Sequence, residues 1–174
     1  HSDYDGKDIL EIGCGLGADL QKFAESGSKV FAIDAAPSSY NSLCRRFELI
    51  NKEFKFEVAD FKSLPFEDSK FDLIYSFGVL HHSPWIKDGI LEASRVLKKN
   101  GHLIIMLYHK GFKYYVKKIF FRGIIQGKFV KNNIKEVINN YTEEFGGSPT
   151  TLVFSRKEAE ELLKENFYIK KVFG

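Results

Sequence analysis

Apolar residues recur along this 174-residue chain in two alternating patterns, one typical of strands and one typical of helices. Strands are predicted at residues 9–12, 30–33, 54–58, 71–76, 102–108 and 168–173. Helical spacing between them predicts helices after residue 17, after Pro37 and from Ile86 to Leu97. Ser155 and Glu158 form a capping-box pattern that predicts a last helix. Strands that alternate with helices in this way predict an α/β domain with a mostly parallel sheet.

The first strand and the first helix are joined by a turn with glycines at alternate positions, Gly13, Gly15 and Gly17. Glu11 stands two residues before this turn, and Asp34 ends the second strand. Glycine tolerates positive φ and lets a ligand lie against bare backbone. An acid about 20 residues further on can accept hydrogen bonds from ribose hydroxyls. The stretch therefore predicts a site for a nucleotide-type cofactor.

Two cofactor classes fit this arrangement. Gly13, Gly15 and Ala18 satisfy the dinucleotide pattern Gly-x-Gly-x-x-Gly/Ala, so an NAD(P)-dependent oxidoreductase of Rossmann type is one alternative. Glu11 favours the other, because EIGCGLG resembles the first motif of the class I S-adenosylmethionine-dependent methyltransferases. A turn that binds no nucleotide is the purely structural alternative.

A second stretch, VADFKSLPFEDSKFDLIYSFGVLHHSP, resembles the central block of small-molecule methyltransferases of the ubiquinone-biosynthesis type. Asp60 at the strand end, the turn at residues 64–66 and the strand start at residues 71–74 carry this similarity. The resemblance covers roughly residues 7–108. It implies a doubly wound, Rossmann-like and mostly parallel sheet in the order 3-2-1-4-5-6. The chain stops where this fold normally adds an antiparallel seventh strand, so that strand is expected to be missing, and a helical insertion is predicted after strand five.

The resemblance also implies a cofactor, S-adenosylmethionine, with S-adenosylhomocysteine as its product. Asp34 is expected to bind the ribose and Asp60 the adenine amino group, while the Phe61 ring is expected either against the adenine or in the core. The residues expected to bind the cofactor are Glu11, Gly13, Cys14, Gly15, Gly17, Asp34, Ala35, Ala59, Asp60, Phe61, Phe77 and His82. The catalytic candidates, as general bases near the carboxyl edge of the sheet, are His82, Tyr108 and His109.

Metal and disulfide chemistry are not predicted. His81 and His82 are adjacent and point in different directions, and no further ligands stand at metal-binding spacing. Cys14 and Cys44 do not form a disulfide framework, so both are expected to be reduced in a cytoplasmic enzyme. The methyl acceptor is predicted to be a small molecule, and the oligomeric state is left open.

Residues 1–174 are predicted to form a single methyltransferase domain, in which residues 109–150 are a helical cap over the acceptor pocket. Apolar residues between 112 and 120 share one helical face, and eight cations with no acid occupy residues 110–135. A nucleic-acid methyltransferase could use these cations to hold phosphates, and a membrane-surface module could use them on a bilayer. Against the first, no Asn/Asp-Pro-Pro-aromatic motif follows the fourth strand.

Overall fold

The structure is a computed structural model that describes residues 4–111 and 151–173. Its contacts divide the chain into two compact units, His1–Leu80 with Trp85–Met106, and His81–Pro84 with Leu107–Gly174. Each unit is described by itself. The predicted cap at residues 109–150 lies outside the described residues from position 112 onward.

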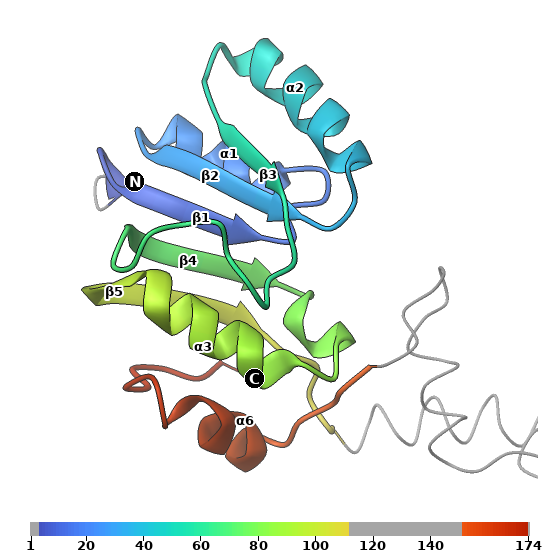
Figure 1. The fold of residues 1–174 in the computed structure, drawn as a ribbon, viewed down its shortest axis with the longest axis vertical. Helices are drawn as coiled ribbons and strands as arrows, with labels where there is room; N and C mark the ends of the chain where they lie inside the picture. The colour runs from blue at the N-terminus through green and yellow to red at the C-terminus, as the bar shows by residue number, and fades with distance from the viewer. Residues whose placement is uncertain (1–3, 112–150, 174) are drawn as a thin grey trace, which may run out of the picture. The chain divides into compact units, whose positions relative to one another are not determined.

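A five-stranded parallel sheet forms the first unit (Figure 1). Its strands are β1 (Asp8–Ile12), β2 (Lys29–Asp34), β3 (Lys55–Val58), β4 (Phe71–Phe77) and β5 (Leu97–Met106), in the order β3-β2-β1-β4-β5. The predicted doubly wound, Rossmann-like class is confirmed by this order. The central strand β1 pairs with β2 and β4, and four of its five residues are buried. A strand covered on both faces is usually apolar almost throughout. The buried acid Glu11 is therefore an exception in β1.

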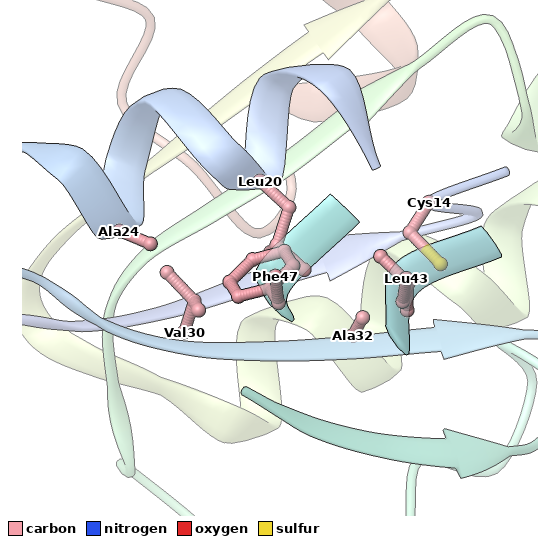
Figure 2. Close-up of a cluster of buried hydrophobic side chains, with 7 residues drawn as sticks. All are labelled: Cys14, Leu20, Ala24, Val30, Ala32, Leu43 and Phe47. Atoms are coloured by element: carbon pink, nitrogen blue, oxygen red, sulfur yellow. The ribbon is translucent and has the colours of Figure 1, made fainter. Parts of the chain in front are cut away.

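Helices cover both faces of this sheet: α1 (Ala18–Glu25) and α2 (Ser38–Ile50) on one, and α3 (Ile86–Val96) on the other (Figure 1). Figure 2 shows the core between α1, α2 and β2. Side chains at helical spacing on the two helices and at alternate positions on the strand form this core, together with Cys14 of the glycine turn. They are Leu20, Ala24, Val30, Ala32, Leu43 and Phe47. Leu43 and Phe47 are fully buried on the inner face of α2, whereas Tyr40 is half exposed.

The turn predicted at residues 64–66 is fixed to α3 by two charged side chains. Arg95 donates to the carbonyl oxygens of Leu64 and Phe66 at 3.0 and 2.8 Å. Glu92 accepts from the backbone N–H of Leu64 at 2.8 Å and from Arg95 at 2.7 Å. Since this loop directly follows Asp60, the arrangement holds the chain that leaves the carboxyl end of β3.

Two predicted strands differ in the structure. β5 begins at Leu97, directly after α3, and not at residue 102; a register irregularity between Phe71 and Leu73 of β4 accommodates the extra residues. Residues 168–173 form no strand, and the side chains of Tyr168 and Phe173 are 90% and 80% exposed. Apolar alternation alone predicts a strand at these positions, but a strand also requires a hydrogen-bonded partner, and residues 168–173 are not paired in the structure.

The second unit contains the predicted last helix, α6 (Arg156–Leu163). Its capping box is confirmed: the Ser155 hydroxyl accepts from the Glu158 N–H, and the Glu158 carboxylate accepts from the Ser155 N–H at 2.7 Å. Across the described residues of both units, no helix is long and apolar enough to cross a membrane.

Candidate functional site

The glycine turn lies between the carboxyl end of β1 and the start of α1. Gly13, Gly15 and Gly17 have φ values of 75°, 49° and 72°, which L side chains rarely adopt. A Cβ atom at Gly13 would also collide with Val79, and one at Gly17 with Leu43, whereas the space beside Gly15 is open. Two of the glycines therefore permit close packing of the protein, and the third leaves bare backbone facing outward.

Asp34 connects this turn to the end of β2. Its Oδ2 accepts from the Gly15 N–H at 2.9 Å, and its Oδ1 accepts from the Ala36 N–H at 2.9 Å. The Cys14 Sγ lies 4.0 Å from Oδ2. Burial, with the negative charge of Asp34 second, raises the pKa of the Cys14 thiol to about 12, so this cysteine stays a neutral thiol. The acid and the glycine turn thus form one hydrogen-bonded loop at the carboxyl edge of the sheet.

Glu11 lies on β1, two residues before the turn, and is 5% exposed. It stands opposite Tyr75 of β4 in the sheet, and the Tyr75 hydroxyl donates to Asp19 of α1 at 3.1 Å. Among the described residues, the Oε2 atom of Glu11 has no hydrogen-bond partner. Burial and then the negative charge of Asp19 raise the pKa of Glu11 to about 8, so the carboxyl group is mostly protonated at neutral pH.

Asp60 follows β3, the neighbour of β2. Its Oδ1 accepts from the Lys62 N–H at 2.9 Å, and its Oδ2 pairs with the Lys62 ammonium group at 3.1 Å. The Ala59 N–H donates to the Asp34 carbonyl oxygen at 3.2 Å, which ties the ends of β2 and β3 together. The ring of Phe61 lies where a Cβ atom on Gly89 of α3 would be, and this contact supports the core alternative for that ring.

The other predicted residues of the first unit are exposed at the same edge. Ala35 follows Asp34 and is exposed. Phe77, the last residue of β4, is 57% exposed, and its ring stacks on Tyr75 at 6.2 Å and 9°. In a parallel α/β sheet, ligands bind in the crevice outside the carboxyl ends of the strands, which is where these residues gather.

The second unit holds the remaining candidates. His82 Nδ1 lies 3.3 Å from the Thr151 hydroxyl, and the His82 and Tyr108 rings meet edge to face at 5.6 Å. His81 is fully buried, with its ring 4.0 Å from that of Tyr108. Two of the three catalytic candidates therefore belong to one cluster, together with His81 and Thr151, which sequence reasoning had not selected.

His109, the third catalytic candidate, is exposed and forms an isolated bridge with Phe154. The backbone groups on either side of it pair with Phe154 at 2.8 Å. His109 therefore takes part in a backbone bridge between two segments of the second unit. In the described ranges, 4–111 and 151–173, no group of three or more His, Cys, Asp or Glu side chains could hold a metal ion.

The fold and the glycine turn define a domain of the doubly wound nucleotide-binding class. Residues 10–105 match the family described as the methyltransferase domain. The chain therefore belongs to this family, of the class I S-adenosylmethionine-dependent type, and the predicted resemblance is confirmed.

Curated relatives agree with this family. An uncharacterized protein of Methanocaldococcus jannaschii is 30% identical over 177 residues, covering 98% of this chain and 65% of that protein. The sterol 4-C-methyltransferase of Caenorhabditis elegans is 34% identical over 98 residues, which are 55% of this chain and 29% of that enzyme. The demethylmenaquinone methyltransferase of Tropheryma whipplei is 32% identical over 103 residues, which are 58% of this chain and 41% of that enzyme. The chain thus spans less than two thirds of each of these relatives.

Solved structures show the same fold. The YcgJ protein of Bacillus subtilis superposes with a TM-score of 0.73 at 19% identity, covering 95% of this chain and 63% of that chain. A SAM-dependent methyltransferase of Methanosarcina mazei superposes with a TM-score of 0.70 at 23% identity, covering 94% of this chain and 80% of that chain. At these identities the similarity establishes the fold alone.

Proposed function

We propose that the chain binds S-adenosylmethionine over its glycine turn and transfers the methyl group to a small-molecule acceptor. The observation that carries this proposal is the hydrogen bond from the Gly15 N–H to Asp34, which joins an open glycine backbone to a strand-end acid. Family membership favours this cofactor over a nicotinamide dinucleotide.

The residues at the edge of the sheet fit the nucleoside part of this cofactor. The Oδ1 atom of Asp34 accepts one backbone N–H and keeps a free lone pair for a ribose hydroxyl. Its Oδ2 atom accepts from the Gly15 N–H and from the Cys14 thiol, and a second ribose hydroxyl would replace the long 4.0 Å thiol contact. Asp60, beyond the neighbouring strand, is assigned to the adenine amino group. That assignment requires Oδ2 to be shared with, or released by, the Lys62 ammonium group.

Bound S-adenosylmethionine would supply a methyl group on a positively charged sulfur, an excellent leaving group. The chain then has to align the acceptor and exclude water. A general base is needed only where the acceptor is a weakly acidic hydroxyl or a protonated amine. Of the three candidates we assign this role to His82, because Thr151 and Tyr108 fix its ring, with Tyr108 beside it as a positioning group.

A small-molecule acceptor is supported by the relatives, which are named for methylation of a sterol, of demethylmenaquinone and of tocopherol. The acceptor of this chain is not identified by these names. A nucleic-acid acceptor has only the cations of residues 110–135 in its favour, and most of that segment lies outside the described residues.

Calorimetric titration with S-adenosylhomocysteine tests the proposal. Native protein should bind it, and Asp34→Asn should weaken binding by about 10- to 100-fold, the effect of losing charge-assisted hydrogen bonds. Asp88→Asn, an exposed carboxylate on α3, is the matched control and should leave affinity unchanged. Binding of NADH with none of S-adenosylhomocysteine would refute the proposed cofactor.

A further inference from the structure

Strand β3 lies at one edge of the five-stranded sheet. It pairs with β2 along one side, and no strand within residues 4–111 and 151–173 pairs with its other side. An edge strand of this kind offers a row of backbone donors and acceptors with which another chain can pair. The backbone and the side chains of β3 together indicate which chain would fit.

Alternate residues of β3 direct their backbone groups to opposite sides of the strand. The Ala59 N–H, directly after β3, donates to the Asp34 carbonyl oxygen of β2 at 3.2 Å. Because this direction alternates along a strand, the odd-numbered residues of β3 also face β2. The even-numbered residues, Phe56 and Val58, and Phe54 just before the strand therefore direct their backbone groups to the open edge.

The side chains of β3 divide into an apolar face and a charged face. The ring of Phe56 packs against that of Tyr40 on α2, with centroids 5.7 Å apart, and Val58 on the same face is 56% exposed. Lys55 and Glu57 are exposed on the opposite face. A strand of four residues thus carries one charge of each sign beside an uncovered apolar side chain.

A second copy of β3 could meet this edge antiparallel in three registers that bring open backbone groups together, with the two-fold axis at residue 55, 56 or 57. The first places Lys55 opposite the partner's Lys55, and the third places Glu57 opposite the partner's Glu57. Like charges directly opposite each other destabilise a sheet. With the axis at Phe56, each Lys55 opposes a Glu57, and Phe54 opposes Val58. Charge therefore selects one register of the three.

We infer that β3 is a dimerisation edge, and that a second copy of this chain pairs with it antiparallel in the register centred on Phe56. The inference goes beyond the proposed function and does not depend on it. Such a contact is symmetric and closes after two copies, because each copy uses its edge once. The partner's Phe54 would cover the exposed Val58 side chain, and the two sheets would become continuous.

Sedimentation equilibrium of native protein tests the dimer. The interface is short, so a dissociation constant on the order of 10–100 µM is expected. Glu57→Lys places lysines opposite each other in both symmetry-related pairs and should weaken the dimer by about tenfold or more. The double variant Lys55→Glu/Glu57→Lys restores opposite charges and should dimerise as native protein does. Glu67→Lys makes the same charge change at an exposed acid before β4 and should have no effect.

Cysteine cross-linking tests the register. In the inferred dimer, Lys55 and the partner's Glu57 form a pair without mutual backbone hydrogen bonds, whose Cα atoms lie about 4.5 Å apart, within the span of a disulfide. Under mild oxidation, a mixture of Lys55→Cys and Glu57→Cys should form a linked dimer, and each variant alone should not. Both variants carry Cys44→Ser, because Cys44 is only partly buried.

Three results would overturn the inference. One is native protein that stays monomeric at roughly 1 mM, well above the expected dissociation constant. Another is a double charge variant that dimerises as weakly as Glu57→Lys, because the two charges would then not be paired. The last is a dimer whose mixed cysteine variants do not link, or in which Glu57→Cys alone links as fast as the mixture.

Discussion

Replacing Arg95 with methionine should destabilise the first unit, because this side chain connects α3 to the loop after Asp60. Methionine keeps most of the apolar volume of the arginine stem and removes its five donors. Arg95 donates to two carbonyl oxygens of the loop after Asp60, to both oxygens of Glu92 and to Asp68. All the groups it satisfies belong to α3 or to that loop.

The expected cost follows from what each partner loses. The bond to Asp68 contributes little, because that side chain is 75% exposed. The carbonyl oxygens of Leu64 and Phe66 lose about 1 kcal/mol each. The Glu92 carboxylate, 19% exposed, loses its counter-ion, which adds about 1–2 kcal/mol. The sum is about 3–4 kcal/mol, or roughly 6–16 °C in Tm for a protein of this size.

Urea denaturation followed by circular dichroism measures this cost directly. Arg156→Met is the matched control, because that residue is 69% exposed and forms one pair along α6, worth about 0.3–0.5 kcal/mol. A loss from Arg95→Met no greater than that from Arg156→Met would refute the view that Arg95 holds the loop.

Three further changes should have separable effects. Between pH 5 and 8 the folded chain holds more protons at Glu11 than the unfolded chain, because the folded pKa of about 8 exceeds the usual 4.5; the stability from this group is therefore complete below pH 4.5 and is lost as pH rises through 8. In urea titrations, the free energy of unfolding of Glu11→Gln should rise relative to that of native protein by up to about 1.4 kcal/mol per pH unit in this range. A difference that stays constant with pH would contradict this. Gly17→Ala should destabilise by about 1–3 kcal/mol more than Gly6→Ala, since both have positive φ but only Gly17 would also collide with Leu43; equal losses in urea melts would contradict the collision. Ser155→Ala should cost about 1 kcal/mol through the lost cap of α6, and faster amide exchange confined to residues 156–159 is the expected sign; unchanged exchange would be evidence against the cap.

The sequence predicted those features that depend on local chemistry. The glycine turn, the strand-end acids and the capping box each follow from backbone requirements at fixed spacing, and the structure contains all three. The order of the five strands followed from the family resemblance, because topology depends on pairings between distant residues.

Features that depend on tertiary contacts could not be predicted in the same way. The sequence marks Arg95 only as a charged residue of a predicted helix, because the loop that it binds lies far from it along the chain. The sequence leaves Phe61 either against the adenine or in the core, because its contact with Gly89 of α3 depends on the tertiary structure. Residues 168–173 alternate as a strand should, yet they form no pairing. No sequence pattern selects His81 or Thr151 as a site residue. Only their contacts with Tyr108 and His82 in the structure indicate that they belong to the cluster.

The proposed cofactor site lies over the glycine turn at the carboxyl edge of the sheet. Amide ¹⁵N–¹H spectra of the labelled chain, recorded during titration with S-adenosylhomocysteine, test it residue by residue. The signals of residues 13–17, Ala35 and Asp60 should move together and saturate at one ligand per chain. Signals from the groove at the opposite edge, lined by Lys29, Glu53 and Lys55, should stay in place. Saturable shifts confined to that groove, with the signal of Gly15 unmoved, would contradict the account.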